Sequence, residues 1–169
     1  IDAIDKIAKK HNLKVIYDAA HCFGTTYKGK SVFGYGDVCT TSFHATKLFH
    51  TVEGGAVFTK DPCVLKTMAL MRNFGHSGPE SFNGVGINGK NSEFHAAMGV
   101  VNLNHIGSIL ARRKEQSLIY TDLLKGLKAS SQKLISEKEY NYAYYPIVFE
   151  SQSTALKMKN ILEKSEIFP

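Results

Sequence analysis

Hydrophobic residues recur along the first part of the chain with two alternating periods, one typical of helices and one typical of strands. Four residues near the start share one helical face: Ile1, Ile4, Ile7 and Ala8. Residues 13–17 then predict a short buried strand, and β-branched residues predict a second strand at 38–43. A third strand is predicted at 55–59. Alternation of helices and strands indicates an α/β architecture for this part of the chain.

Two more helices are predicted after the third strand. Asp61 and Pro62 are typical of a helix start, with Asp as the N-cap and Pro in the first turn. A long loop rich in Gly, Asn and Ser is predicted over residues 73–91, and loops of that length are often functional. From Ser92 a helical region runs to about Leu127. Its inward-facing residues are predicted to be Phe94, Ala97, Met98, Val101, Ile106 and Leu110.

Residues 128–133 form the best domain boundary. Beyond them, residues 140–149 predict a strand and residues 151–164 a helix, which indicates the start of a small α+β domain. The chain begins at Ile1 rather than Met and stops abruptly at Pro169, so we expect a fragment. Residues 1–127 are then the C-terminal part of a large domain with a long linking helix, and residues 128–169 are the truncated start of a small C-terminal domain.

Composition narrows the classes of function. The net charge of +6 comes from scattered lysines, which argues against a nucleic-acid-binding arm and favours a solvated surface or attraction of a phosphorylated substrate. No apolar run approaches the ~20 residues that span a membrane. The three cysteines lack metal-ligand spacing, so we expect reduced thiols, a cytoplasmic protein and no metal site.

The strand at 38–43 leads to the residues with the clearest chemistry. Lys47 stands just beyond this strand, five residues after Ser42. The amine of such a lysine can form a Schiff base with an aldehyde whose phosphate sits on the serine. Asp18, at the end of the preceding strand, could pair with a pyridinium nitrogen. Each residue alone is common at a surface or a turn, but the combination suggests pyridoxal 5'-phosphate (PLP).

Two neighbouring features fit the same cofactor less specifically. His21 could hydrogen-bond the hydroxyl of the cofactor ring or support Asp18, and it could equally be a capping or packed histidine. Glu53-Gly54-Gly55 supplies backbone freedom beside the lysine.

Five runs resemble the DegT/DnrJ/EryC1/StrS sugar aminotransferases in order and spacing, over nearly the whole chain. Three surround the residues above: Tyr17-Asp18-Ala19-Ala20-His21, Ser42-Phe43-His44-Ala45-Thr46-Lys47 and Glu53-Gly54-Gly55-Ala56. Two follow them: Met71-Arg72-Asn73-Phe74-Gly75, and Gly86-Ile87-Asn88 leading to Ser92-Glu93-Phe94-His95-Ala96-Ala97.

The resemblance implies a fold and a role for each residue. The fold is that of the PLP-dependent transferases of fold type I, so residues 1–127 belong to the PLP-binding large domain. Lys47 would be the catalytic lysine that binds the cofactor aldehyde, and Ser42 would bind the phosphate. Asp18 would hold the pyridine nitrogen and His21 the ring hydroxyl side. Asn88 would reach across a homodimer interface to the phosphate site of the partner.

The resemblance also implies a reaction. It is transfer of an amino group, with glutamate as donor, to a nucleotide-linked keto-sugar in cell-surface polysaccharide or amino-sugar biosynthesis. The chain departs from the family at Gly89 and Lys90, where an aromatic residue and an arginine are usual. Alternatives are a PLP-dependent sugar dehydratase, which typically has histidine in place of the lysine, and a non-catalytic fragment that only binds or dimerises. Because the family is more than twice as long, we expect activity to belong to the parent protein.

Overall fold

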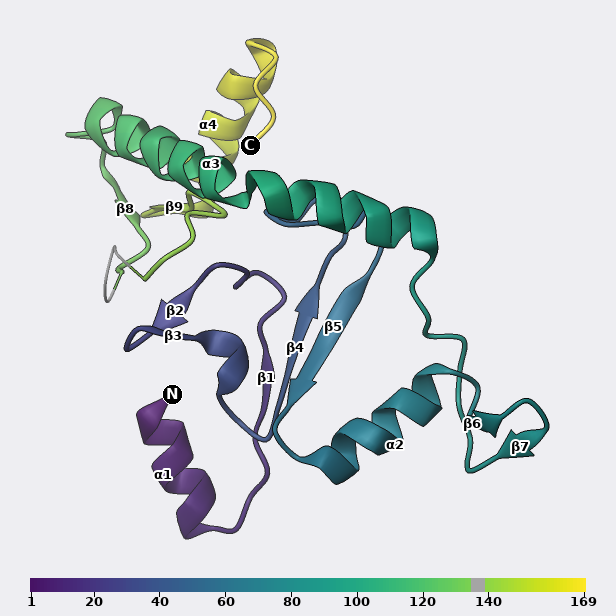
Figure 1. Ribbon diagram of the computed structural model, residues 1–169. Coiled ribbons are helices and arrows are strands. Elements are labelled where there is room, and N and C mark those ends of the chain that lie inside the picture. Colours follow the sequence, from purple (N-terminus) through teal and green to yellow (C-terminus); the bar gives the residue numbers. More distant parts are fainter. Residues whose placement is uncertain (135–138) are drawn as a thin grey trace.

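The computed structural model describes residues 1–134 and 139–169 as a mixed α/β structure (Figure 1). The helices are α1 (Asp2–Lys10), the 3-10 helix η1 (Val32–Gly34), α2 (Pro62–Arg72), α3 (Glu93–Leu123) and α4 (Gln152–Lys164). The strands are β1 (Ile16–Asp18), β2 (Thr26–Tyr27), β3 (Lys30–Ser31), β4 (Val38–Ser42), β5 (Gly55–Thr59), β6 (His76–Gly78), β7 (Ser81–Phe82), β8 (Ala129–Ser131) and β9 (Ile147–Phe149). Within the described residues, no helix combines the length and apolar character that a membrane span requires.

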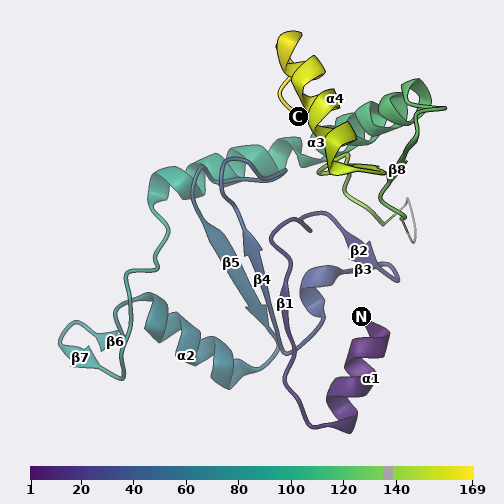
Figure 2. The same cartoon turned by 180° about the vertical axis from the view of Figure 1, so that it is seen from behind.

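A three-stranded sheet in the order β1-β4-β5 organises the first part of the chain. β1 and β4 are parallel, with Asp18 opposite Thr40, and β5 is antiparallel to β4. The carboxyl ends of β1 and β4 therefore meet at one edge of the sheet. Figures 1 and 2 show that α3 crosses this edge, whereas α1 and α2 lie toward the opposite edge.

The first strand begins later in the chain than the sequence predicts. Strand β1 begins at Ile16 rather than at residue 13, because Asp37 holds the chain just before it. The Asp37 carboxylate accepts a hydrogen bond from the Val15 amide at 2.8 Å, and the Val15 carbonyl accepts one from the Asp37 amide at 2.9 Å. These two hydrogen bonds join Val15 to Asp37, and the regular pairing of β1 with β4 begins only at the next residue, Ile16.

Aromatic rings pack against one another around β4 and β5. Phe23 stacks on Phe49 with ring centroids 4.3 Å apart, and Phe43 meets Phe49 edge-on at 4.9 Å. Phe33 stacks on Phe58 of β5 at 4.6 Å. Aromatic pairs of this kind add about 0.5–1.5 kcal/mol each beyond the area they bury. The pairs that include Phe49 fix the chain between β4 and β5 (residues 43–54), which we call the lysine loop.

Two sequence predictions of burial are wrong for this chain. Ile16 of the supposedly buried first strand is 68% exposed, and the supposedly inward-facing Phe94 is 89% exposed. Met98 and Val101 on the same helix are exposed as well. The chain exposes 12568 Å², against about 8,300 Å² expected from the size scaling of folded monomers. The apolar faces exist as predicted, but nothing in the described chain covers them.

Helix starts agree better with their sequence signals. The Asp61 carboxylate accepts hydrogen bonds from the amides of Cys63 and Val64, at 2.8 and 3.2 Å, which confirms its role as N-cap of α2. Ser92 caps α3 in the same way through the His95 amide at 3.3 Å. Residues 73–91 are less irregular than predicted, because β6 and β7 form a small hairpin inside them.

The C-terminal unit (residues 128–134 and 139–169) contains the antiparallel pair β8–β9 and α4. The strand predicted over residues 140–149 is real only for Ile147–Phe149. Before it, residues 140–146 form an irregular run, the tyrosine segment, in which Tyr142 has a positive φ of 53°. β8 lies inside the boundary segment 128–133 and pairs only with β9 among the described strands. The division at residue 128 stays a prediction.

Two glycines of α3 provide a stability test. A Cβ at Gly107 would meet nothing within 4 Å, whereas a Cβ at Gly99 would lie 2.8 Å from Thr51 Cγ2. Gly107→Ala is expected to raise the free energy of unfolding by about 0.5–1 kcal/mol, because alanine loses less backbone entropy in a helix. Gly99→Ala is expected to lower it by about 1–2 kcal/mol through overpacking. Urea titrations of both variants check this, and equal effects would contradict the packing of α3 on Thr51.

Candidate active site

Lys47 lies half-buried in the lysine loop, just past the carboxyl end of β4. Its amide donates to the His44 carbonyl at 2.9 Å, which closes a tight turn. Its amine Nζ lies 3.1 Å from Nε2 of His21, within hydrogen-bonding distance. A lysine and a histidine 26 residues apart are therefore paired in the structure.

The end of β1 and the chain after it place Asp18 and His21 at the same edge. The Ala19 amide donates to the Thr40 carbonyl at 2.8 Å, and the buried Thr41 hydroxyl donates to the Ala19 carbonyl at 3.1 Å. The Asp18 carboxylate accepts the Ala20 amide at 3.0 Å through Oδ1. β4 thus anchors the turn that carries both side chains, and both are exposed.

Ser42 ends β4 beside the lysine. Its hydroxyl accepts the His44 amide at 3.3 Å. His44 in turn pairs through Nδ1 with the Thr46 hydroxyl at 2.8 Å, and its Nε2 lies 3.7 Å from Glu53 Oε1. These contacts give His44 a local role in shaping the lysine loop.

The Gly54-Gly55 pair meets a steric demand. Gly54 has a φ of +152°, and a Cβ there would lie 2.3 Å from the Thr51 hydroxyl oxygen. A Cβ on Gly55 would lie 2.8 Å from the Thr41 carbonyl oxygen. The loop can return into β5 this closely only because both positions lack a side chain. The prediction of backbone freedom at this pair is confirmed.

Helix α3 also contacts the lysine loop and supports it at His50 and Thr51. The side-chain amide of Asn102 donates to the His50 carbonyl at 2.8 Å, and the buried Gly99 lets the helix approach Thr51. The loop is therefore held by the sheet at both ends and by a helix in its middle.

Asn88 is not part of this cluster. It lies on the loop after β7, where it forms a bridge with Asn73 at the end of α2. Its side-chain oxygen accepts the Lys90 amine at 2.9 Å, and the same amine lies 4.1 Å from the centroid of the Phe74 ring. Lys90, at the position where the sequence departs from the family, thus contacts two residues of its own loop.

Sequence reasoning missed a contribution from the tyrosine segment. The ring of Tyr144 lies against that of His21, with centroids 5.0 Å apart. The buried Asn141 donates to the carbonyls of His21 and Phe23, at 2.8 Å each. An asparagine in a run of tyrosines carries no sequence signal for such a contact, because its partners lie about 120 residues earlier.

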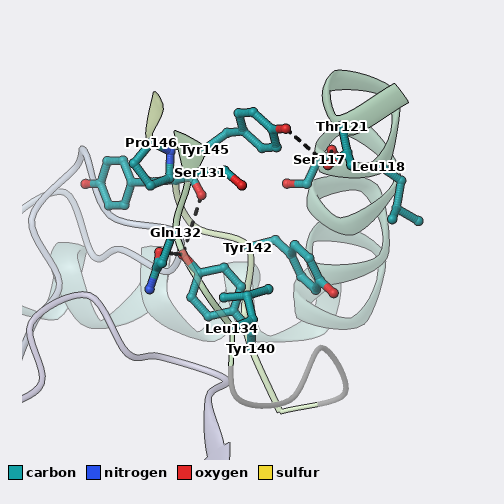
Figure 3. A pocket seen from close by; sticks show the side chains of 11 residues that line it. Ser117, Leu118, Thr121, Ser131, Gln132, Leu134, Tyr140, Tyr142, Tyr145 and Pro146 are labelled. Carbon is teal, nitrogen blue, oxygen red and sulfur yellow. Dashed lines mark hydrogen bonds between the residues drawn. The ribbon is translucent and has the colours of Figure 1, made fainter. Parts of the chain in front are cut away.

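A cavity of about 250 Å³ opens between the tyrosine segment and α3 (Figure 3). Tyrosine rings form much of its wall, and the hydroxyls of Thr121 and Tyr145 face each other at 3.1 Å. Tyr144 belongs both to this wall and to the contact with His21. Among the described residues, no cluster of His, Cys, Asp and Glu is arranged to hold a metal ion.

Cys22 reports on the electrostatics beside Asp18. Burial raises the pKa of its thiol, and the nearby Asp18 charge raises that pKa further. Cys39 is buried and has a raised pKa for the same leading reason, whereas Cys63 is exposed. Since the thiolate is the nucleophile, Cys63 is expected to be alkylated first by iodoacetamide at mildly alkaline pH.

A charge-neutral variant tests this electrostatic link. Asp18→Asn is expected to speed alkylation of Cys22 at fixed pH, because a lower pKa leaves more thiolate. Peptide mass mapping over time gives the rate at each cysteine, and Cys63 serves as the internal control. An unchanged Cys22 rate in Asp18→Asn would contradict the influence of this carboxylate.

The residues at the carboxyl edge of β1 and β4 fit PLP in chemistry. An aldehyde needs an amine, a pyridine nitrogen needs a carboxylate, and a phosphate needs hydroxyl and amide donors. Lys47, Asp18 and Ser42 offer these groups from two adjacent strands.

Sugar transaminases are among the known proteins with similar sequences. A dTDP-4-amino-4,6-dideoxy-D-glucose transaminase of Shigella dysenteriae is 38% identical over 99% of this chain and 48% of its own length. A UDP-4-amino-4,6-dideoxy-N-acetyl-beta-L-altrosamine transaminase of Helicobacter pylori is 31% identical over 96% of this chain and 44% of its length. The chain thus spans about half the length of these relatives.

Solved structures agree with this fold. Helicobacter pylori PseC, an aminotransferase involved in pseudaminic acid biosynthesis, superposes with a TM-score of 0.88 at 27% identity, over 97% of this chain and 46% of that one. This structural neighbour has the fold type I of PLP-dependent transferases, which the family resemblance implied, and PLP is the cofactor of the family. The family model of the DegT/DnrJ/EryC1/StrS aminotransferases matches residues 1–167. The chain therefore belongs to the DegT/DnrJ/EryC1/StrS aminotransferase family.

Proposed function

We propose that the chain is the lysine-bearing part of a PLP-dependent aminotransferase that moves an amino group to a nucleotide-linked keto-sugar. The observation that carries this proposal is the pairing of Lys47 Nζ with His21 Nε2 at 3.1 Å, beside Asp18 and Ser42. The proposed substrate class is supported by the two relatives above, which are transaminases of 4-amino-4,6-dideoxy sugars linked to dTDP or UDP. Glutamate is the proposed donor, in cell-surface polysaccharide such as lipopolysaccharide or in amino-sugar biosynthesis.

Each residue has a task in this proposal. When bound, PLP supplies an aldehyde that captures amines and a ring that accepts the electrons released at the substrate carbon. The Lys47 amine would hold the cofactor aldehyde and would move protons at the substrate carbon. Asp18, oriented by the Ala20 amide, would keep the ring nitrogen protonated. Ser42 would bind the phosphate, and His21, which contacts the lysine amine, would hold the ring hydroxyl side.

We further propose that the complete protein is a cytoplasmic homodimer. Support comes from the exposed apolar faces of β1 and α3, since a surface excess of several thousand Å² needs covering. Asn88 is exposed on its loop, where it is accessible to a second subunit. Part of the excess also corresponds to the half of the relatives' length that this chain does not span.

Covalent trapping tests the proposed role of Lys47. Borohydride reduction of the complete protein, loaded with PLP, should fix the cofactor on one ε-amino group. Mass mapping is expected to find it on the peptide that contains Lys47. Attachment at another lysine, or none in a loaded protein, would reject the proposed role. The same reduction applied to residues 1–169 alone is expected to give lower occupancy, because only part of the site's surroundings is present.

A further inference from the structure

A buried polar side chain of the C-terminal unit contacts the candidate active site. Asn141 is only 2% exposed, which is the lowest exposure among the buried polar residues of the described chain. Burying an amide costs free energy unless its donors and acceptor are bonded. Its Nδ2 donates to the carbonyl of His21 and to that of Phe23, both at 2.8 Å. Its Oδ1 accepts the Ala143 amide at 3.1 Å.

This bonding leaves the amide one orientation. Both N–H groups of Nδ2 are used on the chain that follows β1, and the oxygen is used on the tyrosine segment. A flipped amide would set its oxygen against two carbonyl oxygens. Asn141 therefore fixes the distance between the tyrosine segment and the backbone of His21.

The ring of Tyr144 restrains the same histidine from the side. It lies 5.0 Å from the His21 ring at an interplanar angle of 57°. The His21 side chain is exposed, and the Tyr144 ring limits the rotamers that its imidazole can adopt. Backbone and ring of His21 are thus both held by residues of the C-terminal unit.

His21 passes this placement on to the lysine, because its Nε2 lies 3.1 Å from Lys47 Nζ. We propose that Asn141 and Tyr144 are positioning residues, which hold His21 so that its imidazole orients the Lys47 amine. This inference rests on the proposed function in taking Lys47 as the reactive group. Its consequence is that the lysine adopts its working position only when the C-terminal unit is docked on the sheet edge.

Nuclear magnetic resonance of the His21 ring tests the inference in the complete protein without any turnover. Long-range ¹H–¹⁵N spectra, with His21 assigned by His21→Gln, report the environment of Nε2. In the parent protein, Lys47→Ala is expected to shift the Nε2 resonance, because it removes the neighbouring amine. In an Asn141→Asp background the same change is expected to give no shift, because a carboxylate repels the two carbonyls that the amide held.

Matched variants separate positioning from a general loss of structure. Asn160→Asp makes the same chemical change on the exposed face of α4 and is expected to leave the Lys47-dependent shift intact. If Asn141→Asp does not fold, Tyr144→Leu replaces it, and Tyr144→Phe is the control that keeps the ring. A Lys47-dependent shift that survives in Asn141→Asp or Tyr144→Leu would overturn the inference. Failure of the proposed function would appear elsewhere, as turnover that persists in Lys47→Ala.

Discussion

Lys47→Ala in the complete protein is expected to lower kcat for amination of a nucleotide-linked keto-sugar by at least about a thousand-fold. The variant loses the amine that holds the cofactor aldehyde and the group that moves protons at the substrate carbon. The lysine loop itself should remain, since its anchors are the Phe43–Phe49 contact and the Asn102–His50 hydrogen bond. Initial rates with glutamate as donor, at saturating PLP, measure the effect.

Lys6→Ala is the matched control. Lys6 is exposed on α1, which lies toward the opposite edge of the sheet (Figure 1), so parental rates are expected. Near-parental turnover in Lys47→Ala would reject the aminotransferase proposal.

Gly75→Ala is expected to have the largest effect on local stability. Gly75 has a φ of +78°, and a Cβ there would lie 2.0 Å from the Gly84 carbonyl oxygen, a backbone atom that cannot rotate away. The left-handed backbone and the overpacking together should cost about 3 kcal/mol. The affected segment is the loop that presents Asn88, which is joined to α2 by the Ile87 amide on the Met71 carbonyl at 2.8 Å. Hydrogen exchange of the Ile87 amide measures the loss.

Gly84→Ala supplies the comparison within the same loop. Gly84 also has a positive φ, of +138°, but a Cβ there meets nothing within 4 Å. It should therefore show only the backbone cost of about 1 kcal/mol. Equal acceleration of exchange in the two variants would show that the contact between Gly75 and Gly84 contributes nothing.

The parts of the fold that follow local rules could be predicted from the sequence. β-Branched residues indicated β4, and the Asp61-Pro62 pair indicated the start of α2, because these signals act within a few residues. Parallel pairing then brings Asp18 and Ser42 to one edge. The sequence did not predict the β6–β7 hairpin, because its strands are too short to show an alternating pattern.

What could not be predicted depends on residues far apart in the chain. The Asn141 contact with His21 joins positions 120 residues apart, and no local pattern distinguishes it from a surface asparagine. The prediction that Phe94 is buried was wrong for a different reason. The pattern at Phe94 reports that one face of α3 is apolar, but it does not say whether the surface that covers this face belongs to the described chain.

The continuous course of α3 has a mechanical consequence. Asn102 bonds the lysine loop, and Thr121 meets Tyr145 of the tyrosine segment at 3.1 Å. At 1.5 Å of rise per residue these contacts are about 28 Å apart, so a tilt of about 10° at Asn102 would move Thr121 by about 5 Å. The helix is thus a stiff lever whose pivot is the His50 carbonyl. A force that pulls the C-terminal unit away from His21 is transmitted to the backbone that carries Lys47.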